Sequence, residues 1–266
     1  MLHLLNIEFL KLQRNRSFLI LIILFIVSVF GANYIVYEVS TNTGHIVHET
    51  SNKSFRLFEF PEVWQFVSFI SSFLLIIPCF TVIMHTCSEY TYRTHRQNII
   101  DGLSREQYIT AKILYVVSLA LFATILTVAC AFFIGMLGND PISFRDFRCV
   151  FYFFIQALTY IGLSFLLALL IKKAVLTIGI FFIYSFLIEN ILEKNLNRLN
   201  TGIENIGHFL PLSSSDHLLM FDILKTAMRL ANIESYAPEN AYLTASVIYI
   251  VLIGYACYYL YKKRDL

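Results

Sequence analysis

The sequence carries little charge for its length. Only 14% of its 266 residues are Asp, Glu, Lys or Arg, against about 25% in an ordinary soluble domain, while 58% are hydrophobic. The apolar residues also lack the short periods of amphipathic helices and strands, because they come in blocks of about twenty. An ordinary soluble domain is therefore excluded, and the apolar blocks decide the class of protein.

Motifs for nucleotide binding and hydrolysis are missing. The sequence contains no G-x-x-x-x-G-K-[ST] for the phosphates of ATP and no H-E-x-x-H for a catalytic zinc ion. The triplet Gly162-Leu163-Ser164 lacks the second glycine of a nucleophile elbow and lies inside an apolar block, where a serine serves helix packing. We therefore expect no catalytic residue and no cofactor in this chain, and we do not expect it to be an enzyme.

Charge is also missing from the middle of each apolar block. Carriers coupled to protons or sodium ions place carboxylate, His or Arg side chains near the bilayer midplane. The polar residues at that depth are here only Ser, Thr and Gln. Energy for any vectorial work would therefore have to come from elsewhere, most simply from a partner.

Six apolar windows are long enough to cross a bilayer as helices. A hydrocarbon core about 30 Å thick needs roughly 20 helical residues, and only the fifth window carries a charge, Glu189. A spanning barrel would show ten-residue segments of alternating hydrophobicity, which are absent. The sequence therefore predicts an all-α integral membrane protein with six transmembrane helices in a single domain, 1–266. The predicted spans are 18–37, 63–84, 113–137, 150–171, 174–192 and 241–260.

Two adjacent lysines, Lys172 and Lys173, separate the fourth and fifth windows. One helix from Val150 to Leu192 would be about 64 Å long, twice the thickness of the bilayer. Each lysine inside lipid would cost about 2.5–3.5 kcal/mol on insertion scales. The lysines therefore predict a tight hairpin at a membrane surface.

Positive charge gathers on one side of these spans. With both termini inside, the short inside segments hold 12 of the 20 Lys and Arg residues. The outside segments, counted with Glu189 at the outer end of the fifth window, hold 13 of the 18 Asp and Glu residues. Cytoplasmic loops are enriched in Lys and Arg. We therefore expect a multi-pass protein of the cytoplasmic (inner) membrane with cytoplasmic N- and C-termini. Since the lipid membrane accounts for the basic residues, no nucleic acid is needed as a partner.

Segment 1–16 mixes apolar with charged residues, which predicts an amphipathic helix at the inner interface. The alternative is a charged flank that only follows the positive-inside rule. The first apolar window is longer than the core of a signal peptide, so we expect it to remain as an anchor.

The polar segment 88–112 lies between the second and third windows. Asp101-Gly102 is a turn signal, and Ser104 with Gln107 has the spacing of a capping box. The segment therefore predicts a short cytoplasmic helix, a turn, and a helix that continues into the third window. The alternative is an ordinary solvated loop whose positive charges anchor the protein.

Segment 193–240 is too long for a simple connection. Its part 203–212 is apolar but is broken by Gly207 and Pro211, which predicts a re-entrant or interfacial element near the outer surface. From Asp216 onward, apolar residues follow helical spacing. The alternative is a small extracellular cap helix with no role in gating.

Two groups of residues offer metal-ligand chemistry. His45, His48 and Glu49 lie in a polar loop, and His85 and Glu89 lie four apart at the inner end of the second window. Neither group offers a complete ligand set of the usual spacing. For His85 and Glu89, contact with a cation donor from a neighbouring helix is the alternative to a metal or proton site. We expect no metal site in this chain.

The polar stretch after the second window also resembles a known family. The matching residues are Glu89, Thr94, Asp101-Gly102-Leu103-Ser104-Arg105, Tyr108 and Lys112. Together with six spans, an amphipathic N-terminal helix and a long broken segment before the last span, this stretch resembles the ABC-2 type permeases, the membrane-spanning subunits of ABC exporters. Pro211 after Phe209-Leu210 resembles the outer Leu-Pro element of that family.

The resemblance implies the permease fold of type V-like exporters. Two permease subunits, identical or homologous, would form the path, and separate P-loop ATPase subunits would bind ATP and Mg. Residues 2–16 would be the connecting helix, 93–107 the coupling helix and 203–230 the extracellular gate. The implied gate residues are Phe209, Leu210 and Pro211. The implied residues for coupling to the ATPase are Glu89, Arg93, Arg96, Asp101, Gly102, Ser104 and Arg105.

Two other classes of function stay open at this point. An intramembrane enzyme acting on lipid or peptide would be active as a purified chain and would depend on His85 or Glu89. An ATP-independent facilitator would carry flux without nucleotide, and a membrane scaffold would carry none. The sequence leaves the transported substrate open.

Overall fold

The computed structural model is built of helices. No strand occurs among the described residues, so the predicted all-α fold class is confirmed. The described residues are 15–47, 60–92, 94, 104–137, 141–198, 206–220 and 237–263. Outside these residues lie 1–14 of the predicted amphipathic helix, nearly all of the predicted coupling segment before Ser104, and His48 and Glu49.

Helices occupy all six predicted windows. In chain order the elements are α2 (Arg16–Val47), α3 (Val63–Phe73), α4 (Ile76–Thr91), α6 (Arg105–Leu137), α7 (Arg148–Ile171), α8 (Ala174–Ile183), the π-helical turn η1 (Tyr184–Ile188), α9 (Glu189–Arg198), the 3-10 turn η2 (Ile206–Phe209), α10 (Ser213–Leu219) and α12 (Glu239–Lys263). Among the described residues, five helical stretches are long and apolar enough to cross a membrane, and the pair α3–α4 makes a sixth if it is one span.

The second window differs from the prediction because it is two helices, α3 and α4, bent by 42°. Pro78 explains the break, since it has no N–H to donate to the carbonyl of Leu74, four residues earlier. The amides of Leu74 and Leu75 donate three residues back instead, to Ser71 and Ser72, at 3.1 and 3.2 Å. The predicted span is thus two helical pieces that meet at an angle.

The hairpin predicted at the two lysines is confirmed. Helix α7 ends at Ile171 and α8 begins at Ala174. Lys172 takes a left-handed conformation with φ 61° and donates its amide to the carbonyl of Ala168 at 3.0 Å, which closes the last turn of α7. Through η1, α8 then continues into α9, so that the fifth window is one helical stretch of 25 residues.

Helix α7 is the centre of the bundle, and α3, α4, α6, α8, α10 and α12 all pack against it. In its most apolar stretch 56% of the residues are buried, against 17% in α2 and 11% in α12.

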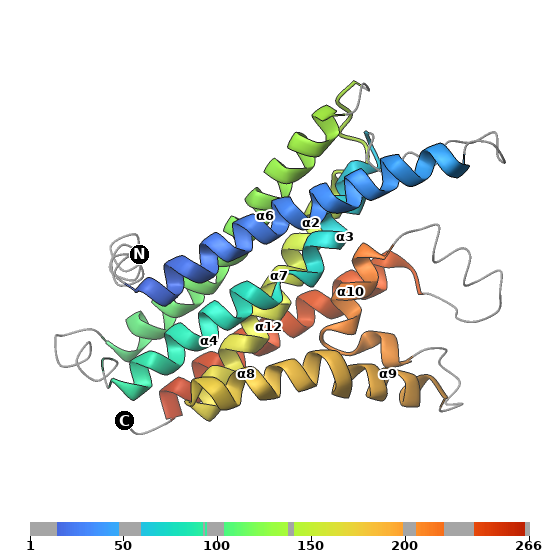
Figure 1. Ribbon diagram of the computed structural model, residues 1–266. Coiled ribbons are helices and arrows are strands. Elements are labelled where there is room, and N and C mark those ends of the chain that lie inside the picture. Colours follow the sequence, from blue (N-terminus) through green and yellow to red (C-terminus); the bar gives the residue numbers. More distant parts are fainter. Residues whose placement is uncertain are drawn as a thin grey trace.

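The first residues of α2 and the last of α12 lie at the same end of the bundle (Figure 1). We name this the basic end, because its described residues include Arg16, Lys112, Lys172, Lys173, Lys262 and Lys263. The distal end holds α9, η2, α10 and the start of α12 (Figure 1).

The fully buried Trp64 holds three helices together at the distal end. Its indole N–H donates to the carbonyl of Ser143 at 2.8 Å. Edge-on contacts join the Trp64 ring to Phe132 of α6 and to Phe147, just before α7, with centroids 5.0 and 5.1 Å apart. The starts of α3 and α7 and the end of α6 are thereby fixed to one another.

Candidate functional site

A buried ion pair joins α4 to α6 at the basic end. The Lys112 Nζ lies 2.8 Å from Glu89 Oε1, and the two side chains are 1% and 5% exposed. His85 completes the cluster, with its Nε2 3.1 Å from Lys112 Nζ and 3.9 Å from Glu89 Oε1. The predicted contact between Glu89 and a cation donor on a neighbouring helix is therefore confirmed, and the cation is Lys112.

Tyrosines extend this cluster to α12. The hydroxyl of Tyr108 donates to Glu89 Oε2, and the Tyr108 ring stacks on Tyr261 with centroids 5.0 Å apart. Glu106, in the first turn of α6, accepts from the hydroxyl of Tyr258 at 2.9 Å. Three helices, α4, α6 and α12, are thus tied together near the end of α4 and the start of α6.

The predicted coupling residues fall into three groups. Ser104 forms the predicted capping box with Gln107. The backbone N–H of Gln107 donates to Ser104 Oγ at 3.2 Å, and the backbone N–H of Ser104 donates to Gln107 Oε1 at 3.0 Å. Arg105 begins α6 directly after this cap. Glu89 is buried and paired with Lys112, so its carboxylate is not on the surface. The remaining four, Arg93, Arg96, Asp101 and Gly102, lie outside the described residues.

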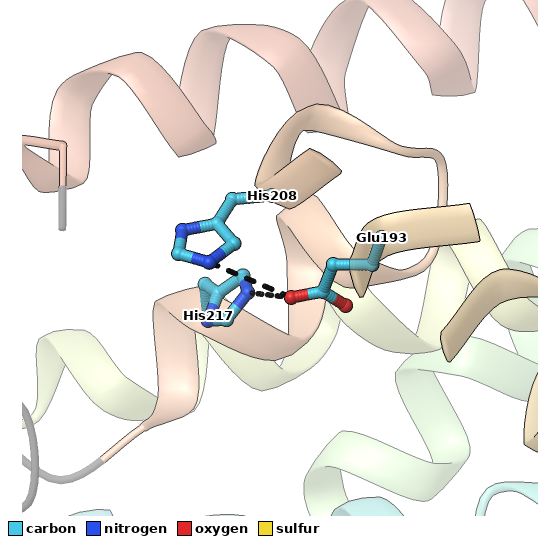
Figure 2. Close-up of side chains that lie close together, drawn as sticks. All are labelled: Glu193, His208 and His217. Carbon is cyan, nitrogen blue, oxygen red and sulfur yellow. Dashed lines mark hydrogen bonds and ion pairs between the residues drawn. The ribbon is translucent and has the colours of Figure 1, made fainter. Parts of the chain in front are cut away.

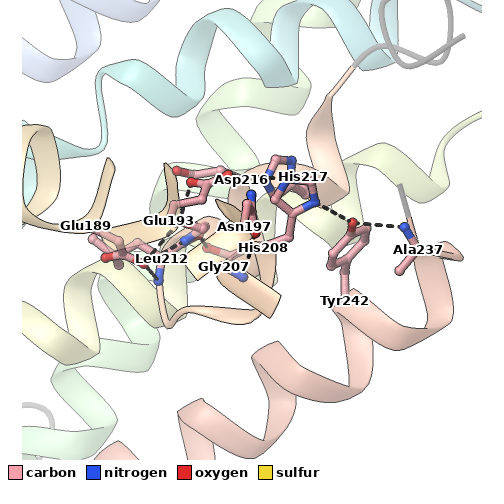
Figure 3. Close-up of polar contacts among 12 residues, drawn as sticks. Glu189, Glu193, Asn197, Gly207, His208, Leu212, Asp216, His217, Ala237 and Tyr242 are labelled. Atoms are coloured by element: carbon pink, nitrogen blue, oxygen red, sulfur yellow. Dashed lines mark hydrogen bonds and ion pairs between the residues drawn. The ribbon is translucent and has the colours of Figure 1, made fainter. Parts of the chain in front are cut away.

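At the distal end, the carboxylate of Glu189 caps the short helix α10. Its Oε1 accepts from the amides of Leu212 and Ser213 at 2.6 and 2.8 Å (Figure 3). A carboxylate is favourable there because it pairs with amides that have no partner within the helix. Helix α10 begins at Ser213 and ends at Leu219, so it overlaps the stretch of helical spacing that begins at Asp216 only as far as Leu219. The rest of that stretch, from 221 onward, lies outside the described residues. The sequence pattern missed the start at Ser213 because the cap comes from a different helix.

Asp216 joins α10 to the central helix α7. Its carboxylate accepts from Gln156 Nε2 at 2.7 Å and from the Tyr160 hydroxyl at 2.9 Å. Helix α10 is thus bonded both to α9 and to α7.

The predicted gate residues lie together in the turn between η2 and α10. The carbonyl of Phe209 accepts from the Tyr249 hydroxyl of α12 at 2.9 Å, and its ring lies 5.3 Å from that of Tyr242. Leu210 donates its amide to Gly207 at 3.2 Å, and the Pro211 carbonyl accepts from Ser214 Oγ at 3.3 Å. The apolar part 203–212 is thus a broken element in its described residues, as predicted, and contacts α12 through Phe209.

A second polar cluster lies beside this turn and was missed by sequence reasoning. Glu193 of α9 lies with its Oε1 3.0 Å from His217 Nε2 of α10 and 3.6 Å from His208 Nε2 of η2 (Figure 2). His208 is fully buried, and its Nδ1 lies 3.1 Å from the Tyr242 hydroxyl. The sequence signal was weak, because two histidines nine residues apart follow no common ligand spacing.

Long apolar helices packed side by side, with charged clusters at the two ends, define a multi-pass α-helical membrane protein. A family model described as ABC-2 family transporter protein matches residues 2–266. The chain belongs to this family, and it is a permease component of an ABC transporter. The family implies an ABC ATPase as a partner, so the chain is a transport subunit and not an enzyme by itself. No curated protein matches the chain.

Proposed function

We propose that this chain is the permease subunit of an ATP-driven exporter, coupled to separate P-loop ATPase subunits through segment 88–112. ATP and Mg bind to the partner ATPase, and a second permease subunit, identical or homologous, completes the translocation path. The observation that carries this proposal is the buried Glu89–Lys112 ion pair at the base of the 93–103 segment. Because His85 and Glu89 are both bonded to Lys112, they support this role better than the role of an enzyme's active site.

The ion pair allows the segment to act as a lever, that is, to transmit force from the ATPase to the membrane helices. A push on residues between α4 and α6 can move the membrane helices only if the two helix ends do not simply separate. The Glu89–Lys112 pair resists that separation, because leaving one buried charge without its partner costs about 3–5 kcal/mol. Tyr108 extends the connection to α12, so that a force on the segment reaches three helices together.

The gate of this exporter is the turn Phe209–Leu210–Pro211. Glu189 holds one side of the turn from α9, and the Tyr249 hydroxyl holds the other side from α12. A relative movement of these two helices would therefore pull on both sides of the turn. This arrangement supports a gate at the end opposite to the lever.

Membrane orientation gives the first test. The basic end is placed in the cytoplasm, because positive residues favour that side. All five native cysteines are buried, which gives a low background for thiol labelling. Exposed Lys194, on α9, and Lys262, 65% exposed at the end of α12, are suitable positions for single cysteines. We expect an impermeant maleimide to label K194C in intact cells and K262C only after permeabilisation. The reverse pattern would contradict the proposed orientation.

Coupling to the ATPase gives the second test. The chain is coexpressed with a P-loop ATPase encoded by a neighbouring gene, and copurification and ATP hydrolysis are measured in proteoliposomes. We expect Arg105→Glu to insert normally but to lose the ATPase activity that depends on the permease. Lys194→Glu is the matched control, because it makes the same charge reversal on the exposed surface of the distal end. Wild-type coupling by Arg105→Glu would refute the assignment of segment 88–112.

A further inference from the structure

We propose that Glu193, His208 and His217 form a binding site for a transition-metal dication of the zinc class. The site joins α9, η2 and α10, which supply one ligand each (Figure 2). The sequence analysis expected no metal site and did not bring these three ligands together, since they come from three separate elements. Metal binding as such does not depend on the proposed transport function.

The distances suit a four-coordinate metal. One nitrogen from each histidine and one oxygen of Glu193 all lie within 4.8 Å of one another. With metal–ligand bonds of about 2.0–2.2 Å, tetrahedral ligands lie roughly 3.3 Å apart. The separations of Glu193 Oε1 from the two Nε2 atoms, 3.0 and 3.6 Å, lie on either side of that value. Small side-chain shifts would therefore complete three of the four positions.

The surrounding contacts orient the ligands for a metal. The Tyr242 hydroxyl accepts from the amide of Ala237 at 3.1 Å and lies 3.1 Å from His208 Nδ1 (Figure 3). Because a hydroxyl oxygen has two lone pairs, it can also accept from Nδ1–H, and in that tautomer the free lone pair of His208 is on Nε2. The second oxygen of Glu193 accepts from Ser213 Oγ at 2.9 Å, which fixes the carboxylate. Two of the three ligands thus have the supporting hydrogen bonds typical of metal sites.

The local charge also favours a cation. Ser213 Oγ contacts both Glu189 and Glu193, at 3.3 and 2.9 Å, so two carboxylates share one hydroxyl. Like charges that are close and partly buried repel one another, and a dication between the histidines and Glu193 would reduce this repulsion. The side chains of Glu193 and His217 are 18% and 13% exposed, which leaves an entry path and access for a water molecule as the fourth ligand.

A donor set of two imidazoles and one carboxylate selects the class of ion. Imidazole nitrogen suits zinc, copper, nickel and iron, whereas magnesium and calcium prefer oxygen ligands alone. A bound ion would fasten η2 and α10 to α9 on both sides of the Phe209–Pro211 turn. If the proposed gate is correct, the ion would therefore hold the gate closed.

The test is metal titration of the purified full chain in lipid nanodiscs after treatment with a chelator. Zn²⁺ is titrated in competition with a fluorescent indicator, and Co²⁺ is titrated by visible absorption. We expect one equivalent of Zn²⁺ per chain and the intense absorption bands of four-coordinate Co²⁺. We expect Glu193→Gln and His217→Gln to weaken Zn²⁺ binding by more than about tenfold, since the loss of even a supporting residue typically costs 10–100-fold.

Glu239→Gln is the matched control. Glu239 is a carboxylate of the same end, 30% exposed and paired with Arg148 at 3.4 Å, outside the cluster. It should bind Zn²⁺ as the wild type does. The proposal is overturned if the wild type binds no Zn²⁺, or if Glu193→Gln and His217→Gln keep wild-type affinity.

A measurement on the wild type alone avoids the possibility that a variant fails to fold. Zn²⁺ should raise the melting temperature of the wild-type chain and a chelator should reverse the rise, because a ligand that binds the folded state stabilises it. An unchanged melting temperature would count against the site. If Zn²⁺ binds but does not inhibit ATP-dependent transport, the metal site stands and the proposed gate fails.

Discussion

The two ends of the bundle differ in the groups that bind their buried carboxylates. At the basic end, Glu89 meets Lys112 at 2.8 Å, and opposite charges neutralise each other inside two adjoining helices. At the distal end, Glu193 meets two histidines, which are charged only when protonated, and the carboxylates are held by amides and hydroxyls. The basic end is therefore held by a pair of opposite charges, whereas the contacts of Glu193 with the two histidines depend on protons or on a cation.

This difference agrees with the proposed roles. A lever must keep its connection to the membrane helices through each cycle, so a buried ion pair suits the basic end. A gate must open and close. Contacts whose charge changes with protonation or with a bound cation therefore suit the short elements of the distal end. Variants that remove one kind of contact at a time show how far this comparison holds.

The largest loss is expected from Lys112→Met. The substitution leaves the carboxylate of Glu89 buried without its cation and should lower the free energy of unfolding by about 3–5 kcal/mol. The measurement is SDS titration of the purified chain in mixed micelles. The double variant Glu89→Gln, Lys112→Met should recover much of this loss, because no buried charge then remains. Equal stability of the single and double variants would contradict a charge pair.

A smaller loss is expected at the distal end from Glu189→Ala. This change removes the acceptor for the Leu212 and Ser213 amides and should cost about 2–3 kcal/mol in the same SDS titration. Asn190→Ala is the control, because Asn190 is the exposed neighbour on the same helix. If the two variants lose equal stability, the carboxylate cap contributes little.

The close contact between η2 and α9 gives the next prediction. A Cβ on Gly207 would lie 2.3 Å from the backbone oxygen of Glu193, so Gly207→Ala must push η2 away from α9. We expect a loss of about 1–3 kcal/mol, as for other overpacked contacts. Gly179→Ala, at a helical position with no atom near the added Cβ, should lose none of this stability. Similar melting curves for both variants would exclude a close contact at Gly207.

The smallest effect is expected at the exposed part of the basic end. Ser104→Ala removes the hydroxyl that accepts from Gln107 and should cost about 1 kcal/mol. Hydrogen exchange should show fraying confined to the first turn of α6. Exchange that spreads to the amides around Lys112 would show that the cap, and not the ion pair, holds this end.

Features set by local sequence were predicted well. The apolar windows, the turn at Lys172 and the Ser104–Gln107 capping box were all found, because each depends on neighbours a few residues apart. Pro78 was also visible, but its effect was not predicted, since a proline bends some membrane helices and breaks others. The start of α10 at Ser213 was not predicted, because its cap lies on another helix.

By itself, the sequence determined that this protein is a set of membrane helices. In lipid each backbone N–H and C=O must be hydrogen-bonded within the segment, so an apolar window of about twenty residues forms a helix. Only the tertiary structure decided which side chains meet across these helices. Glu89 and Lys112 are 23 residues apart, and Glu193 and His217 are 24 apart, so their contact depends on the rotation and packing of whole elements. Hydropathy does not encode that rotation, and the candidate sites at both ends depend on it.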